Sequence, residues 1–507
     1  MTLISSIHGL LSGTSWPPYA TILTAATILW ISYQVIYELF LSPLSPFPGP
    51  FWAQFTDLWH VAVITFGQEH TTIYALHEKH GPVVRLGPNK LSVTDEIAYR
   101  KIYNTAAPFI KSNYYDPFKL PGVRDVFTER NENMHGKLRR PIATTFSSEG
   151  IKDLDGNIDE ILKKFISQME LFQGQNLDLG QWFERLLFDC ISEMAFEQNS
   201  GMLDKVSETN LFEWIYGMLR EAHTLGAAPT LFAITSFIMR FIGPKDPTAK
   251  FKGNDIDKLI DRFMEHQEKI KSIGQSQRNL ASRLLQVQAA SKSEALTDKE
   301  FRLLLQVILI AGTTDAVTWL NSVFYHLIHN PDKKAKLLQE LREKRVQGQL
   351  GDVCTSQQAA TCPYLNAVLQ ESLRLYPSNA GLLPRETPET GIELAGHQIP
   401  AGVTIGAPAY VIQRLPNIFG ADTNSFLPER WLENPNAEMN RFIMGFGTGS
   451  RTCLGRTVRY IRTTFMRESV NALTSSEGLY LDAFHVNGLM LKDFKALIWF
   501  LRGASPS

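Results

Sequence analysis

The chain has 507 residues, of which 44% are hydrophobic and 20% charged, and its 50 basic and 51 acidic residues give a formal net charge of −1. This balance excludes the strongly basic surface typical of nucleic-acid-binding proteins, so we expect no nucleic-acid partner. Length alone suggests about three domains. The chain has four cysteines, Cys190, Cys354, Cys362 and Cys453. Their spacing indicates neither a disulfide framework nor a set of zinc ligands, which fits a reducing compartment.

An apolar stretch near the N-terminus, Tyr19 to Phe40, is long enough to span a bilayer, which needs roughly 20 helical residues. Trp30 and Tyr37 lie in it, and both residue types favour membrane interfaces. A secretory signal peptide is the alternative, but it would need a basic n-region and a small-residue cleavage site. The first basic residue is Lys79, so the positive-inside rule gives no orientation. The sequence predicts a retained membrane anchor over residues 1–42.

Residues 43–50 contain four prolines, which predicts a stiff, non-helical linker. Further on, two short apolar runs between Val83 and Val93 flank Gly87-Pro88-Asn89, a turn signal, and predict a β-hairpin. Residues 106–130 are rich in aromatics, proline and glycine without a helical or strand period, so we expect an irregular loop. Residues 150–300 have mostly amphipathic helical spacing.

His135 and Arg139 are four residues apart and share one face of the next predicted helix. The planar fork of an arginine suits a carboxylate partner. The alternative is a solvated basic face, to which Lys137 and Arg140 would belong.

Residues 301–330 form the longest predicted helix, which ends at Asn330-Pro331. It contains Ala311-Gly312-Thr313-Thr314-Asp315. A glycine costs about 1 kcal/mol relative to alanine inside a helix, so Gly312 needs a use. The alternative for the threonines is that their hydroxyls only bond to carbonyls one turn earlier.

Two further amphipathic helices are predicted over residues 331–345 and 364–376. The second carries Glu371 and Arg374, which can pair on one face. On a surface such a pair contributes little to stability. About fifty residues later comes Phe426-Leu-Pro-Glu-Arg430-Trp, which supplies a second arginine.

The most informative stretch is Phe446-Gly-Thr-Gly-Ser-Arg-Thr-Cys453-Leu-Gly455. Its glycines let the backbone turn tightly and approach a flat partner. Arg451, two residues before Cys453, offers a cation to an anionic group. A cysteine thiolate in such a loop can be the axial ligand of haem iron. The alternative for a lone cysteine is a small buried hydrophobe.

This loop and the order of the motifs before it resemble the haem-thiolate monooxygenases of the cytochrome P-450 superfamily. Residues 78–146 resemble fungal microsomal members of the pisatin demethylase-like type. The resemblance implies a mainly α fold, a triangular helical prism with small β-sheets, over residues 51–507 behind one N-terminal transmembrane helix. It implies heme b with Cys453 as the axial thiolate. Further cofactor contacts would come from His135, Arg139, Arg385, Phe446, Arg451 and Gly455.

By the same resemblance, Glu371, Arg374 and Arg430 form a structural triad, and residues 106–130 cover the substrate. Ala311 to Asp315 would form the oxygen groove, with Gly312, Thr313, Thr314 and Asp315 as its site residues. The family has an acid followed by a threonine there, whereas this chain has Thr314 followed by Asp315. Adjacent helical side chains point about 100° apart, so we expect Asp315 to face the groove.

The implied activity is that of an oxidoreductase, a monooxygenase of EC 1.14 type. It would use O2 and NADPH-derived electrons from a reductase to oxidise an apolar small molecule by hydroxylation, epoxidation, dealkylation or desaturation in specialised metabolism. We expect a monomer in the endoplasmic reticulum membrane with its body facing the cytosol. Arg456 and Arg459 could dock an acidic electron donor. Two alternatives are a haem-thiolate isomerase or lyase that needs no O2, and a non-catalytic haem-binding membrane protein.

Overall fold

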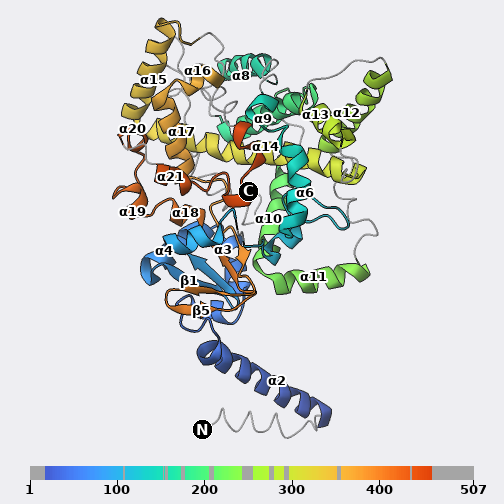
Figure 1. The fold of residues 1–507 in the computed structure, drawn as a ribbon, viewed down its shortest axis with the longest axis vertical. Helices are drawn as coiled ribbons and strands as arrows, with labels where there is room; N and C mark the ends of the chain where they lie inside the picture. Colours follow the sequence, from blue (N-terminus) through green and yellow to red (C-terminus); the bar gives the residue numbers. More distant parts are fainter. Residues whose placement is uncertain are drawn as a thin grey trace, which may run out of the picture.

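The computed structural model confirms a mainly helical fold with two small β-sheets. A helical body carries the sheets at one end, and helix α2 (Pro18–Ile36) projects away from that end (Figure 1). The structure describes residues 18–106, 109–151, 154, 158–172, 177–204, 210–242, 255–272, 279–290, 296–350, 356–433 and 437–458.

Helix α2, which lies outside the body, continues into a π-helical turn, η1 (Tyr37–Leu41), whose Glu38 contacts the body. The apolar window Thr21–Leu41 is 0% buried and is long and apolar enough to cross a membrane. The predicted N-terminal apolar helix is therefore confirmed. Helix α14 (Asp298–His329) passes the same test of length and composition, but 44% of its window is buried inside the body.

The proline-rich segment after the anchor is packed onto the body. Leu44 and Phe47 are buried in a core cluster shared with the strands. Arg85 is fully buried beneath this segment, and its backbone N–H donates to the Pro48 carbonyl at 2.8 Å. Its guanidinium pairs with Glu38 of η1. The end of the N-terminal apolar helix is thus tied to the first strand of the sheet.

The predicted hairpin is confirmed as β1 (Val83–Gly87) and β2 (Lys90–Val93), which pair antiparallel with Val83 opposite Val93. Strand β2 runs parallel to β6 (Thr404–Gly406), and β6 runs antiparallel to β3 (Arg385–Glu386). The sheet order is β1-β2-β6-β3, so β6 separates the hairpin from β3, where Arg385 lies opposite Ile405. Strands β4 (Ile392–Leu394) and β5 (His397–Ile399) form a separate hairpin.

Helix α14 runs through the centre of the body and packs on α9 (Leu179–Phe196) and α17 (Pro363–Leu375). It starts with a capping box, in which Glu300 Oε2 accepts from the Thr297 N–H at 2.8 Å. It ends at His329, before Asn330-Pro331, as predicted. A Cβ on Gly312 would lie 3.1 Å from Cδ1 of Ile191 in α9, so this glycine lets the two helices approach.

Shorter helices complete the body. They are η2 (Phe51–Gln54), α3 (Leu58–Thr65), α4 (Glu69–His80), α5 (Glu96–Ile102), η3 (Asn113–Phe118), α6 (Glu132–Ala143), α7 (Ser148–Ile151), α8 (Ile158–Leu171), α10 (Leu211–Ala227), α11 (Pro229–Ile242), α12 (Asp255–Ser272), α13 (Leu280–Ala290), α15 (Pro331–Val346), α16 (Ser356–Ala360), α18 (Ala409–Ile412), α19 (Pro416–Phe419), α20 (Arg430–Glu433), α21 (Ala437–Arg441), η5 (Gly449–Arg451) and η6 (Leu454–Val458).

Candidate functional site

The cysteine loop is held by backbone contacts that leave its sulfur accessible. Gly447 and Gly449 have φ values of +65° and +67°, the left-handed region that glycine adopts without strain. A Cβ on Gly449 would lie only 2.6 Å from the Tyr103 carbonyl oxygen. The Cys453 N–H donates to the Phe446 carbonyl at 2.8 Å, and the Cys453 side chain is exposed. The loop therefore presents a sulfur atom from a fixed backbone.

Helix α6 binds this loop from one side. Arg139 donates from Nη2 to the carbonyl of Thr452, the residue before the cysteine, at 2.6 Å. Burial lowers the pKa of Arg139, and the nearby charge of Cys453 opposes this shift. Arg451 donates from Nε and Nη2 to Oε1 of Glu132, in the first turn of α6, at 2.9 and 2.6 Å. Contacts of two arginines thus connect α6 to Arg451 and Thr452, the two residues that precede the cysteine.

Phe446 joins the loop to the central helix. Its ring meets the ring of Trp319 in α14 edge to face, with centroids 6.3 Å apart. Gly455 lies in η6, where a Cβ would be 3.5 Å from the Cys453 sulfur, an ordinary contact distance. Its lack of a side chain is therefore not forced by the described surroundings.

Arg385 approaches the same region from strand β3. Its side chain is 4% exposed, and Nη1 donates to the Pro384 carbonyl at 3.0 Å. An isolated β-bridge joins it to Lys111, a buried lysine that the sequence analysis did not single out. The Lys111 ammonium lies 4.0 Å above the ring centroid of Tyr115, and it donates to the Phe127 carbonyl. The aromatic-rich segment over residues 106–130 thus contributes a cation as well as aromatic rings.

Lys111, His135, Arg139, Arg385 and Arg451 form what we call the basic cluster. Burial, and then the charges of Arg385 and Arg451, hold the pKa of Lys111 well below its ordinary value. Burial, and then Arg451, Arg139, Lys111 and Arg385, lower the pKa of His135 to about 3, so this histidine is neutral at pH 7. Like charges this close and this buried repel strongly.

Among the described residues, Arg451 is the one member of the basic cluster with a carboxylate at ion-pair distance, that of Glu132. Glu132 and Asp125 also favour the charged form of Lys111, but at longer range. Buried charge without a partner is costly, so the cluster suits an anion with more than one negative group. The two propionates of haem have this character, and the accessible Cys453 sulfur supplies the metal ligand that haem iron accepts. The residues present therefore fit a haem group.

The groove residues of α14 divide between two faces. Thr313 and Thr314 are buried, and their hydroxyls donate to the carbonyls of Leu309 and Ile310 at 2.8 and 3.0 Å. Asp315 is exposed, on the helix face that also carries Ala311 and Thr318. The alternative that both threonines bond back into their own helix is thus what the structure contains.

Glu371, Arg374 and Arg430 are brought together in the interior. Arg374 donates to both oxygens of Glu371, at 2.8 and 2.7 Å, and Arg430 donates from Nε to Oε1 at 3.0 Å. Burial opposes ionisation of Glu371, but the hydrogen bond and charge of Arg374 and the charge of Arg430 lower its pKa. Trp431, which the sequence analysis did not single out, donates to Oε2 at 2.8 Å. This network fixes the segment that leads to the cysteine loop.

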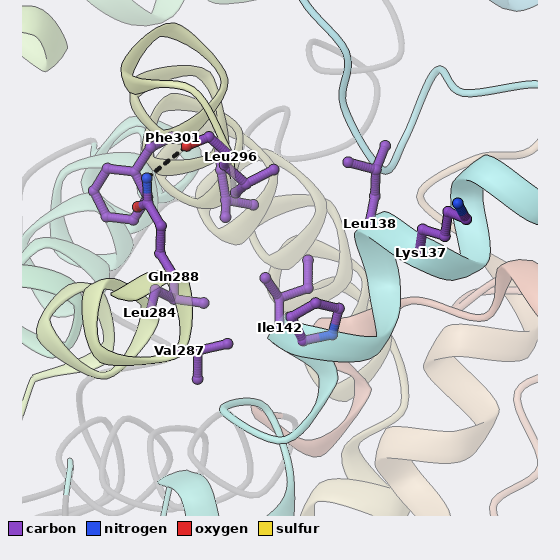
Figure 2. A pocket seen from close by; sticks show the side chains of 10 residues that line it. Lys137, Leu138, Ile142, Leu284, Val287, Gln288, Leu296 and Phe301 are labelled. Atoms are coloured by element: carbon purple, nitrogen blue, oxygen red, sulfur yellow. Dashed lines mark hydrogen bonds between the residues drawn. The ribbon is translucent and has the colours of Figure 1, made fainter. Parts of the chain in front are cut away.

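A separate hollow of about 20 Å³ lies between α6, α13 and α14 (Figure 2). Leu138 and Ile142 line it from α6 and Leu284 from α13, and the Gln288 amide donates to the Leu296 carbonyl at 2.6 Å. It has room for about one water molecule and contains no residue of the basic cluster. We do not connect it with the cysteine loop.

One prediction at the C-terminal end, the docking role of Arg459, lies outside the described residues. Arg456 is described and is exposed in η6.

Comparison with known proteins gives one consistent result. A family model described as Cytochrome P450 matches residues 46–459. The chain is 29% identical over 447 residues to the cytochrome P450 monooxygenase hepC of Aspergillus oryzae, covering 84% of this chain and 86% of the relative. It is 29% identical over 458 residues to the cytochrome P450 monooxygenase gsfF of Penicillium aethiopicum, with coverages of 86% and 89%. It is 27% identical over 453 residues to pisatin demethylase of Fusarium vanettenii, with coverages of 87% and 85%.

Proposed function

The chain belongs to the cytochrome P450 family, and from this premise we propose that it is a monooxygenase that oxidises an apolar small molecule in fungal specialised metabolism. Its electrons would come from NADPH through a reductase. The observation that carries the proposal is the exposed Cys453 sulfur on a loop that Arg139 and Gly449 fix, beside the buried basic cluster. The similarity to hepC and gsfF supports the reaction class.

The residues that would hold haem have distinct tasks. Cys453 would ligate the iron through its thiolate, and Arg139, Arg385, Arg451 and Lys111 would bind the propionates by charge. His135, which is neutral, would donate a single hydrogen bond. Haem with a thiolate ligand supplies oxygen activation when it is bound. The protein itself binds the substrate, excludes water and delivers protons.

Proton delivery is the task in which this chain departs from the family pattern. Thr313 and Thr314 use their hydroxyls inside α14. We therefore assign the proton donor to the carboxyl group of Asp315, which lies on the exposed face of α14. Thr318, one turn further along that face, donates its own hydroxyl to the Thr314 carbonyl at 3.3 Å. Gly312 would serve the groove by letting α14 lie against α9.

The membrane would hold the protein at its sheet-bearing end. The apolar helix α2 supports a single-pass anchor, and we propose that it lies in the endoplasmic reticulum membrane with the body in the cytosol. Helix α11 adds an exposed apolar surface, with Phe237 62% and Phe241 74% exposed. The exposed Arg456 would contribute to docking an acidic reductase, and the monomer is the proposed state.

A reduced CO difference spectrum of membranes containing this chain tests the proposal. We expect the band of thiolate-ligated haem in the wild type and its loss in Cys453→Ser. Candidate pathway intermediates, fed with reductase, NADPH and O2, should be oxidised only by the wild type. Turnover that continues without NADPH and O2 would favour the isomerase or lyase alternative, which the order Thr314-Asp315 motivates.

A further inference from the structure

A second group of titratable side chains is buried away from the cysteine loop, with Glu69 of α4 at its centre. Its Oε1 lies 2.9 Å from Nε2 of His60 in α3, and its Oε2 lies 2.9 Å from Nε2 of His223 in α10. A Cβ on Gly381 would lie 3.1 Å from Glu69 Oε2, so the missing side chain at Gly381 makes room for the carboxylate. One carboxylate thus connects two helices that are far apart in sequence.

Hydrogen bonds extend this group in both directions. On the His60 side, the Lys90 ammonium of β2 contacts His60 Nδ1 at 3.3 Å, Asp57 Oδ1 at 3.2 Å and the Ala227 carbonyl at 2.6 Å. On the other side, His223 Nδ1 is hydrogen-bonded to the Tyr114 hydroxyl of η3. A hollow of about 20 Å³ lies among these residues, with room for about one water molecule.

The hydrogen bonds define the charges of the group. Lys90 can only donate, so His60 accepts at Nδ1, donates from Nε2 to Glu69 and is neutral. Burial, and then the charge of Lys90, lower the pKa of His60, which likewise favours its neutral form. Burial also disfavours the charged form of His223, but the charge and hydrogen bond of Glu69 outweigh it and raise the His223 pKa above 6.5. Glu69 and His223 therefore form an ion pair, because the same histidine holds the pKa of Glu69 well below its usual range although burial opposes this.

Segment η3 connects this group to the proposed cofactor site. Tyr114 contacts His223, while the next residue, Tyr115, lies within 3.5 Å of Arg385 Nη1 and under the Lys111 ammonium. A Cβ on Gly226 would lie 2.4 Å from the Tyr114 carbonyl oxygen, so the end of α10 is pressed against η3. Just beyond, α10 bends by 116° into α11, which exposes its apolar side chains. The ion pair thus stands between an apolar surface and the basic cluster.

We propose that Glu69, His223 and Tyr114 form a charge-dependent latch that holds the α10–α11 bend against η3 and limits the passage of apolar molecules to the cysteine-loop site. The access role rests on the proposed function, whereas the latch itself does not. When the latch opens, the bend and η3 separate. In the closed state, Lys90 ties the end of α10 to β2 through the Ala227 carbonyl.

The latch has a defined pH window. Because the pKa of His223 is raised, the free energy that charged His223 contributes to the closed latch is complete below the ordinary histidine value of 6.5. It is lost as pH rises through the raised value. A lowered Glu69 pKa means that its contribution is lost only as pH falls well below 4.5. The neighbouring His60 is neutral, because burial and the charge of Lys90 lower its pKa. The latch is therefore closed below the ordinary histidine value and loosens as pH rises through the raised His223 value.

Hydrogen exchange of the full-length protein, with its haem and in nanodiscs, measures the latch directly. We expect peptides from η3 and from the end of α10 to exchange severalfold faster at about pH 8 than at about pH 6, after correction for the intrinsic rate, because deprotonation of His223 removes its charge pair with Glu69. Glu69→Gln should exchange rapidly at both pH values. Tyr114→Phe, a milder change, should free η3 while the pH dependence of α10 remains.

Glu340→Gln is the matched control, since Glu340 is a part-buried carboxylate that accepts from the Tyr364 and Leu365 N–H groups away from the bend. It should exchange like the wild type at both peptides. The proposal is overturned if Glu69→Gln keeps the wild-type pH dependence, or if Glu340→Gln reproduces its effect.

The access role has its own readout, the rate at which a bulky azole shifts the haem absorption band. We expect Glu69→Gln to bind the azole severalfold faster and to bind CO at the wild-type rate, because CO is small. Equal azole rates would overturn the access role. If the wild type instead gives no thiolate spectrum, the proposed function fails, while the exchange result still decides the latch.

Discussion

At the scale of single residues, Arg451 carries the connection between the cysteine loop and α6. Its Nε and Nη2 both donate to Oε1 of Glu132, and Nη1 donates to the Glu129 carbonyl at 2.6 Å. The Arg451 side chain is only 4% exposed. The planar fork of Arg451 carries donors on three nitrogen atoms and so reaches the Glu132 carboxylate and the Glu129 carbonyl together, whereas a lysine has all its donors on one atom.

We predict that Glu132→Gln lowers the free energy of unfolding of the haem-loaded protein by about 1–2 kcal/mol, because it leaves a buried guanidinium without its carboxylate. Denaturant unfolding followed by tryptophan fluorescence measures this. Glu96→Gln is the control, since the Glu96–Arg100 pair is about 40% exposed on both sides and should contribute within about 0.5 kcal/mol. Equal effects of the two changes would contradict the argument.

His326 predicts an acid sensitivity. Its ring stacks on Phe426 with centroids 4.4 Å apart, and Nε2 has no hydrogen-bond partner among the described residues. Burial lowers its pKa to about 3, against the opposing charge of Glu371. The unfolded chain therefore takes up this proton first, and stability is lost as pH falls from about 6.5 toward 3.

Replacing His326 by phenylalanine keeps the stack and removes the titration. Between about pH 7 and pH 5, the wild type should lose about 2 kcal/mol more unfolding free energy than His326→Phe. Denaturation midpoints at the two pH values test this difference. A variant with the wild-type pH slope would show that His326 does not control it.

At the scale of secondary-structure elements, the contact between α14 and α9 depends on one missing side chain. A Cβ on Gly312 would meet three atoms of Ile191 at 3.1–3.2 Å. Alanine is favoured over glycine by about 1 kcal/mol inside a helix, but overpacking a core costs about 1–3 kcal/mol. Packing therefore wins over helix propensity at this position.

We predict that Gly312→Ala destabilises the protein by about 1 kcal/mol in the wild-type background and stabilises it when Ile191 is also alanine. The control is Gly217→Ala in α10, where an added Cβ meets nothing within 4 Å and should stabilise by about 1 kcal/mol. Thermal unfolding of the wild type, Gly312→Ala, Ile191→Ala and the double variant gives the coupling energy between the two positions. An additive cycle would mean that Ile191 moves aside freely.

Elements that depend on neighbouring residues were predictable from the sequence, and contacts between distant segments were not. The β1–β2 hairpin follows from a turn signal between apolar runs, and the Glu371–Arg374 pair follows from helical spacing. Lys111 could not be found in this way, because its partner Arg385 comes from strand β3 far along the chain. The orientation of Thr313 likewise depends on how α14 packs against its neighbours, which no local pattern encodes.

At the scale of the whole molecule, the anchor and the body are joined by a buried ion pair as well as by the chain. Arg85 of β1 is fully buried, and its guanidinium contacts the Glu38 carboxylate, the Glu38 carbonyl at 3.3 Å and the Pro88 carbonyl at 2.8 Å. Leu44 and Phe47, which lie in the sequence between Glu38 and Arg85, pack in the core cluster that includes Val83 of β1. The anchor therefore leaves the body in a set direction.

This connection makes the position of a truncation matter. Removal of residues 1–36 leaves Glu38 in place, whereas removal of residues 1–42 leaves Arg85 buried without its carboxylate. Loss of one partner of a buried pair costs about 3–5 kcal/mol, so the longer truncation should unfold at a clearly lower denaturant concentration. Glu38→Gln within the shorter truncation should reproduce most of that loss without any change in chain length. If the two truncations unfold together, the pair does not stabilise the body, and the apolar contacts of Leu44 and Phe47 alone fix the anchor.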